Sequence, residues 1–179
     1  VGMCEDRTVE MPSGAALPAA IVRSENPGPT VVVTGNVHGD ETTGIGVVHN
    51  LVRRLPRVLC CGEVVLYPTL NPAGLMAGTR TLPGDGQDLN RMFPGKARGP
   101  ASERHAHAIW TDIQACEPDV LLDLHTDVAG AIPYAIVDRV VRLRERRRLS
   151  AQCLRLAGAG GLTVLREYPR ERYLRYGLD

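Results

Sequence analysis

The amino-acid sequence predicts an α/β fold, a three-layer α/β/α sandwich around a mixed, mostly parallel sheet. The β-branched run TVVVT is typical of a strand that is buried on both faces, and the runs EVVLYPT and DVLLDL indicate two further strands. Between and after these runs, apolar residues recur at helical spacing. Strands that alternate with helices favour parallel strands joined by crossover helices.

Two strands and a helix are predicted in the first third of the chain. Residues 16–24 form a strand that ends at the turn signal ENPGP, and residues 30–34 form a buried strand that precedes the glycine-rich loop GNVHGDETTG. A helix over 43–55 is expected to pack on the sheet, because its apolar residues share one face: Ile45, Val48, Leu51, Val52 and Leu55.

The middle of the chain contains a long polar stretch between two predicted strands. A strand over 63–69 leads into a glycine-rich segment from 71 to 100, and loops of this length are uncommon unless they are functional. A helix over 102–115, with Ser102 as its N-cap, then precedes a strand over 119–124.

The last part of the chain predicts one further strand, helix and strand. These elements cover 134–137, 139–157 and 162–166, and GAGG ends the helix. The sequence has no internal repeat or low-complexity linker, and 179 residues suit a single domain.

Composition excludes several classes of protein and partner. The chain is 44% hydrophobic and 23% charged, as is typical of globular proteins, and its net charge of +1 favours neither nucleic acid nor a membrane surface as a partner. No apolar run approaches the ~20 residues needed to span a bilayer. The five cysteines lack C-x-x-C spacing, and two of them are adjacent, which suits neither a disulfide framework nor a thiolate zinc site. We therefore expect a cytoplasmic protein.

Two histidines and a glutamate form a candidate metal site. His38 and Glu41 lie three residues apart on the loop after a predicted strand, with Gly39 expected to let the backbone bend between them, and His125 ends the strand LLDLH. Ligands in open α/β sheets bind where loops leave the carboxyl ends of strands. Two histidines and one carboxylate are a ligand set of catalytic zinc, which leaves a fourth position for water or substrate.

Three segments resemble the signature loops of a known family. VVVTGNVHGDETTG, LNPAGLMAGTRTLPGDGQDLNRMFPG and VLLDLHT are similar, in order, to loops of the succinylglutamate desuccinylase/aspartoacylase family, a branch of the zinc carboxypeptidase-like fold. The resemblance implies deacylation of a small N-acyl amino acid by zinc-activated water, with one Zn²⁺ per chain. It implies His38, Glu41 and His125 as metal ligands, Arg80 as the group that polarises the scissile carbonyl, and Asn90 and Arg91 as the pair that binds the substrate carboxylate.

Other polar residues have less specific interpretations. Asp123 lies two positions before His125, on the same face of a regular strand, where it either orients that histidine or bonds to backbone at the sheet edge. His49, His105 and His107 have no partners at metal-ligand spacing and are expected to be surface or helix residues.

One part of the family's pattern is missing from the sequence. The mechanism of such enzymes needs a glutamate general base, which in relatives lies on a late strand in a segment that reads apolar-Glu-Leu-Gly. No segment here matches it, and Glu167 is the nearest carboxylate. We therefore expect residues 1–179 to be the N-terminal and central part of a zinc-hydrolase catalytic domain that is incomplete at its C-terminus.

The sequence leaves three functions open. The first is a zinc-dependent hydrolase that removes the acyl group from a small N-acyl amino acid, and the second is a metallocarboxypeptidase that uses the same carboxylate clamp. The third, favoured by the missing glutamate, is a zinc-binding module without catalysis. The sequence predicts neither the acyl group, the amino acid nor the oligomeric state.

Overall fold

A computed structural model describes residues 2–138 and 144–167. The chain divides into two compact units, which meet between Thr126 and Asp127 in the sequence. The first unit contains every residue proposed above as a metal ligand or substrate contact. The two units are described separately.

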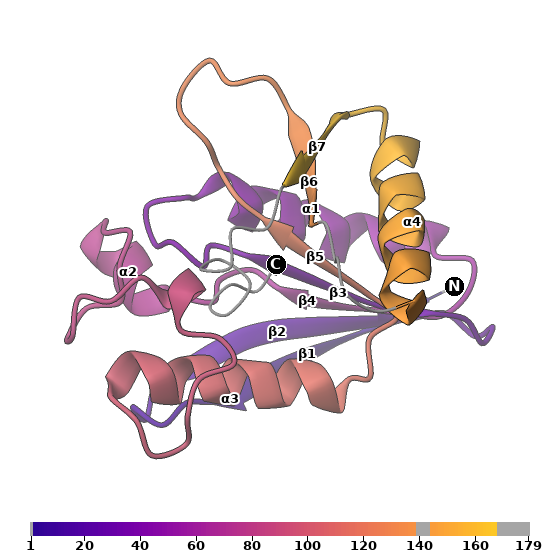
Figure 1. Ribbon diagram of the computed structural model, residues 1–179. Helices are drawn as coiled ribbons and strands as arrows, with labels where there is room; N and C mark the ends of the chain where they lie inside the picture. The colour runs from indigo at the N-terminus through magenta and orange to yellow at the C-terminus, as the bar shows by residue number, and fades with distance from the viewer. Residues whose placement is uncertain (1, 139–143, 168–179) are drawn as a thin grey trace. The chain divides into compact units, whose positions relative to one another are not determined.

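A five-stranded mixed sheet forms the centre of the first unit (Figure 1). The strands lie in the order β1-β2-β4-β3-β5, in which β3 pairs in parallel with both β4 and β5. The pairs β1–β2 and β2–β4 are antiparallel. The bounds are Met3–Glu10 for β1, Ala16–Arg23 for β2, Thr30–Gly35 for β3, Glu63–Tyr67 for β4 and Val120–Leu124 for β5.

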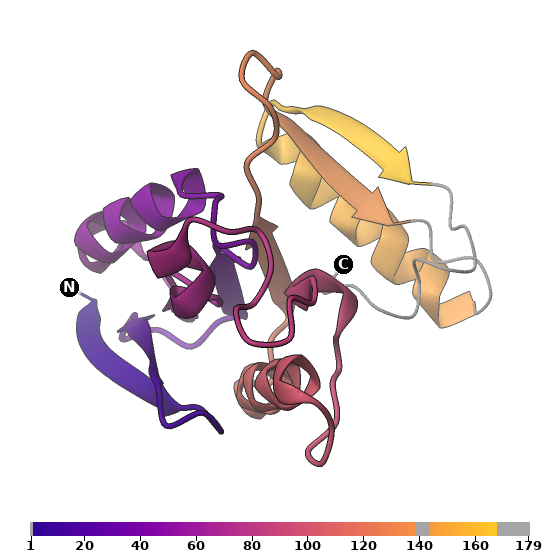
Figure 2. The same cartoon turned by 90° about the vertical axis from the view of Figure 1, so that its left-hand side faces the viewer.

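Helices cover both faces of this sheet, so that the predicted three-layer α/β/α sandwich is confirmed (Figures 1 and 2). Helix α1, Thr43–Val58, packs its Val48 against β-strand residues such as Val33 and Leu66. Helix α3, Ala101–Ala115, contributes to a second core on the opposite face. That core includes Ile21, Val32, Val65, Tyr67, Ala106, Ile109 and Ile113.

The parallel register brings three loops to one edge of the sheet. Thr34 of β3 pairs with Tyr67 of β4 and with Asp123 of β5. Because parallel strands end at the same edge, the loops that follow β3, β4 and β5 leave the sheet side by side.

The segment between β4 and α3 is more ordered than the sequence indicated. It contains helix α2, Pro72–Ala77, and a short 3₁₀ helix η1, Leu89–Arg91. The predicted N-cap of α3 was wrong, because the cap residue is Pro100, which offers no side-chain acceptor. Instead Asp85, from the segment between α2 and η1, accepts a hydrogen bond from the Ser102 N–H at 2.9 Å. A carboxylate thus fills the capping role from another part of the chain.

The second unit contains a parallel strand pair and one helix (Figure 2). β6 covers Tyr134–Asp138, α4 covers Arg144–Ala159 and β7 covers Thr163–Glu167. Helix α4 contacts both strands. This arrangement confirms the predicted strand, helix and strand, while the predicted beginning of the helix at Arg139 lies outside the described residues.

All five cysteines are free thiols. Among residues 2–138 and 144–167, no helix combines the length and the apolar character that crossing a bilayer requires.

Candidate metal centre

The loop after β3 brings His38 and Glu41 together at the carboxyl edge of the sheet. The chain turns at once after the strand, because Asn36 has a positive φ of 55°. The Glu41 N–H then donates to His38 O at 3.0 Å. In this turn His38 Nδ1 lies 2.7 Å from Glu41 Oε1, and the His38 side chain is almost fully buried.

The sequence predicted the wrong reason for a glycine at position 39. Gly39 does not have a positive φ. A Cβ at this position would lie 2.1 Å from the carbonyl carbon of Gly74 in α2, well inside van der Waals contact. Glycine is therefore needed because two backbones pack against each other, and the positive φ falls on Asn36 instead.

His125 reaches the same glutamate from the end of β5. Its Nδ1 lies 3.0 Å from Glu41 Oε2, and the Thr126 N–H donates to that oxygen at 2.8 Å. The His38 and His125 rings lie 5.0 Å apart, centroid to centroid. The structure thus brings together the three residues that the sequence proposed as ligands, from loops separated by 84 positions.

Each histidine has a second carboxylate on its other ring nitrogen. His125 Nε2 lies 2.8 Å from Asp123 Oδ2. Of the two roles considered for Asp123, this contact favours orienting the histidine over bonding to backbone at the sheet edge. The Thr34 hydroxyl donates to the other Asp123 oxygen at 2.7 Å. His38 Nε2 lies 3.2 Å from Asp88 Oδ1. Carboxylates in this position fix the ring and the tautomer of a metal-binding histidine.

Asp88 is a site residue that the sequence interpretation missed. It caps η1 by accepting from the Asn90 N–H at 3.0 Å. Its carboxylate also contacts Arg80, whose Nη2 lies 3.2 Å from Oδ2. The sequence signal that could have identified Asp88 is its position two residues before Asn90, in the segment DLNR.

The charges of the cluster stabilise one another. Burial lowers the pKa of His125, but hydrogen bonds to Asp123 and Glu41 outweigh it and raise the pKa to about 10. The pKa of His38 is also raised, because its bonds to Asp88 and Glu41 outweigh burial. Burial raises the pKa of Glu41, yet bonds from both histidines and Thr126 hold it well below its usual value. The bond to His38 lowers the pKa of Asp88 to about 2.

Of the three other predicted site residues, Arg80 contacts this cluster directly, and Asn90 and Arg91 are connected to it through Asp88. Arg80 has its Nη1 3.4 Å from Glu41 Oε1 and is half exposed. Asn90 and Arg91 are the last two residues of η1, whose N-cap is Asp88. Asn90 is buried, and an Arg91 guanidinium nitrogen donates to the Asn90 carbonyl at 3.1 Å.

The donors of the cluster fit a divalent metal ion. His38, Glu41 and His125 each offer one ligand atom, and these atoms lie within 4.8 Å of one another. Two imidazole nitrogens with one carboxylate match the protein ligands of catalytic zinc, and both histidines have the supporting carboxylates that such sites use. The buried Thr126 hydroxyl, next to His125, has no hydrogen-bond partner among the described residues.

The other three histidines are not part of this group of ligand atoms. His49 is exposed on α1 and His107 is partly buried on α3. His105, also on α3, is buried and donates to Leu70 O at 2.8 Å. The side chain of Glu167, the nearest candidate for the general base, lies outside the described residues.

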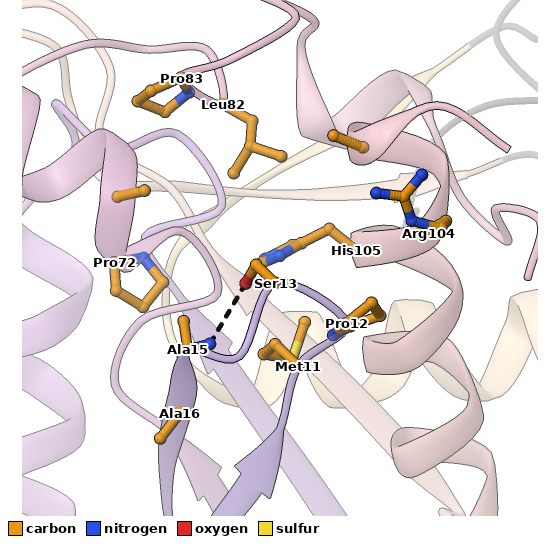
Figure 3. A pocket seen from close by; sticks show the side chains of 12 residues that line it. Met11, Pro12, Ser13, Ala15, Ala16, Pro72, Leu82, Pro83, Arg104 and His105 are labelled. Atoms are coloured by element: carbon orange, nitrogen blue, oxygen red, sulfur yellow. Dashed lines mark hydrogen bonds between the residues drawn. The ribbon is translucent and has the colours of Figure 1, made fainter.

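A separate cavity of about 130 Å³ opens between the β1–β2 turn and the beginnings of α2 and α3 (Figure 3). Apolar side chains such as Met11 and Leu82 line it, together with His105 and Arg104. None of the six predicted site residues lines it. The cavity and the candidate metal centre are therefore different features.

Replacing Asp123 by Asn is expected to weaken zinc binding by about 10- to 100-fold. The Asn oxygen still accepts from Thr34, which leaves the amide NH₂ facing His125 Nε2. The ring must then carry its proton on Nδ1, the nitrogen that faces Glu41. Competition with a chromogenic chelator measures the zinc affinity. Asp119→Asn is the control, because the Asp119 carboxylate accepts from the Thr30 N–H at the other end of β5. Equal affinities for all three proteins would contradict this role.

The chain is similar to known proteins over most of its length. Residues 27–176 match the sequence model of the succinylglutamate desuccinylase/aspartoacylase catalytic domain. The chain is 35% identical over 148 residues to the N-alpha-acetyl-L-2,4-diaminobutyric acid deacetylase of Halomonas elongata, a match that covers 82% of this chain and 43% of the relative.

Solved structures share the fold. An aspartoacylase family protein from Mesorhizobium loti has a TM-score of 0.78 and 29% identity, over 92% of this chain and 52% of that protein. A metallo-carboxypeptidase from Burkholderia cenocepacia has a TM-score of 0.70 and 20% identity, over 98% of this chain and 51% of that protein. The carboxypeptidase-like fold predicted from the sequence is thus confirmed. The chain spans about half the length, or less, of these relatives.

Proposed function

The chain belongs to the succinylglutamate desuccinylase/aspartoacylase family, and on this basis we propose that it binds one zinc ion and hydrolyses the amide bond of a small N-acyl amino acid. His38, Glu41 and His125 are the proposed ligands. The substrate class is supported by the similarity to a deacetylase of an acetylated amino acid.

One observation carries the proposal. The Nδ1 atoms of His38 and His125 face the two oxygens of Glu41, while each Nε2 faces an aspartate. A cation that replaces the protons on the Nδ1 atoms would meet all three donors at once. Both rings would remain fixed by Asp88 and Asp123, which supports a site that is already organised before the metal binds.

Bound zinc would lower the pKa of a water ligand to about 7 and polarise the amide carbonyl. The residues of the chain have the remaining roles. Arg80 adjoins Glu41 and is half exposed, so its guanidinium can move from Asp88 to the oxygen on which negative charge develops. Loss of such a donor typically costs about 10²- to 10³-fold in kcat.

We propose that Asn90 and Arg91 bind the carboxylate of the substrate's amino-acid part. The planar guanidinium of arginine donates two parallel hydrogen bonds to a carboxylate, and an amide adds a neutral donor. Both residues lie at the end of η1, which Asp88 fixes to His38. This linkage supports a fixed distance between the substrate carboxylate and the scissile bond.

A proton acceptor completes the proposed reaction. Glu41 and Asp123 each contact a histidine, and Asp88 contacts both His38 and Arg80. We therefore propose that a carboxylate outside the described residues accepts the proton of the attacking water and passes it to the leaving amine.

The test is hydrolysis by the complete natural polypeptide, loaded with zinc. The panel contains N-acetyl and N-succinyl amino acids, together with dipeptides that have a free carboxyl terminus, and released primary amine is measured. We expect amine from at least one N-acyl amino acid. Turnover of dipeptides alone would favour a carboxypeptidase, and stoichiometric zinc without any turnover would favour a binding module, so either result would overturn the proposal.

A further inference from the structure

The side chain of Asn36 is buried beneath the loop that carries two of the proposed ligands. Its Nδ2 lies 2.9 Å from His38 O, 3.1 Å from Gly39 O and 2.9 Å from Glu41 O. The residue is fully buried. One amide group therefore bonds three of the four carbonyls from His38 to Glu41.

The orientation of this amide follows from its partners. Three backbone carbonyls can only accept hydrogen bonds, so the NH₂ end must face them. The oxygen end accepts from the Thr69 hydroxyl at 2.7 Å. Thr69 follows β4 and also accepts from the Asn71 N–H at 3.2 Å, so Asn36 connects the loop after β3 to the neighbouring strand end.

The backbone of Asn36 indicates that the residue type matters. Its φ of 55° lies in the left-handed region, where glycine is the usual residue and asparagine is tolerated. Glycine would adopt this backbone without strain but would leave the three carbonyls without their donor. The side chain, rather than the turn, is thus what asparagine adds here.

We propose that Asn36 is a positioning residue for the metal centre, whose amide holds the backbone of 38–41 so that His38 and Glu41 project toward one ion. This inference rests on the proposed zinc site. Thr69 acts through Asn36, because its hydroxyl fixes the amide in the orientation that serves the loop.

The variant Asn36→Gly tests the proposal, because it accepts the positive φ and removes only the side chain. Its zinc dissociation constant, measured by chelator competition, is expected to rise about 10- to 100-fold. Asn36→Asp keeps the shape but turns a carboxylate oxygen toward carbonyl oxygens, so its loss should be larger. Asn26→Gly is the matched control, since Asn26 also donates its amide to a backbone carbonyl, that of Cys60, in another loop.

Hydrogen exchange separates positioning from loss of overall stability. In Asn36→Gly without added metal, the Glu41 amide is expected to exchange at least about tenfold faster, while the amides of Val32 and Val65 in the core strands keep their rates. Thr69→Val should weaken zinc binding in the wild-type background. It should add no further loss of zinc affinity to Asn36→Gly, because its effect passes through the missing amide.

The outcomes distinguish this inference from the proposed function. Wild-type zinc affinity in Asn36→Gly would overturn the positioning role and leave the zinc site standing. Weaker binding with equally accelerated exchange at Val32 and Val65 would overturn it as well, because the cause would be general destabilisation. A wild-type protein that binds no zinc would overturn the zinc site and the inference together.

Discussion

Replacing His125 by Ala is expected to abolish stoichiometric zinc retention in a protein that remains folded. His125 directly follows β5 and its side chain is one third exposed, so its removal creates little buried cavity. It supplies one of the three ligand atoms. If the ~10–16 kcal/mol of a structural zinc site is shared over four ligands, losing one weakens binding by on the order of 10²- to 10³-fold.

Zinc per chain after dialysis, measured by atomic emission, and circular dichroism together check this expectation. His38→Ala should lose zinc in the same way, although its buried position makes the protein itself less stable. His49→Ala is the control, because His49 is an exposed histidine on α1. Unchanged zinc content in His125→Ala or His38→Ala would exclude the proposed ligand set.

Gly39→Ala is expected to destabilise the protein and weaken zinc binding together. The added methyl group would lie 2.1 Å from Gly74 C and 2.4 Å from Leu75 N. Both are backbone atoms, so the loop or α2 must shift, and overpacking of this kind typically costs about 1–3 kcal/mol. Because the loop carries His38 and Glu41, the same shift moves both donors away from His125.

Urea unfolding and chelator competition measure the two effects of Gly39→Ala. Gly46→Ala is a matched control, because a Cβ at Gly46 in α1 has no neighbour within 4 Å. That variant should be more stable than the wild type by roughly 0.5–1 kcal/mol, since alanine favours helix more than glycine. Wild-type stability and zinc affinity in Gly39→Ala would contradict the close packing of the loop on α2.

The sequence predicted the elements that have a clear hydrophobic pattern. Strands β3 and β4 are apolar runs buried in the sheet, β5 is an apolar run that is only partly buried at the sheet edge, and α1 and α3 have an apolar face. β1 was missed because it lies at the sheet edge, where the mostly exposed residues MCEDRTVE show no such pattern. α2 was missed because its six residues are too few for periodicity, and its caps are Asn71 and Gly78.

The candidate site was predictable where it depends on strand ends, and not where it depends on packing between loops. His38, Glu41 and His125 follow two parallel strands that are neighbours in the sheet, so their convergence follows from the topology. Asn36 and Asp88 act through contacts across the fold, to Thr69 and to His38, which no local spacing indicates. The close packing of Gly39 against Gly74 also joins two distant segments of the chain, so local spacing does not indicate it either.

The positions of α1 and α3 also show that the winding of the chain reverses at this edge. The chain leaves β3 toward the face covered by α1 and leaves the adjacent β4 toward the face covered by α3. Neighbouring connections that diverge in this way mark a topological switch point, the place where open α/β sheets bind ligands. The position of the candidate site therefore follows from the winding of the chain itself, so changes in loop length or sequence can alter what binds there while the place of binding stays the same.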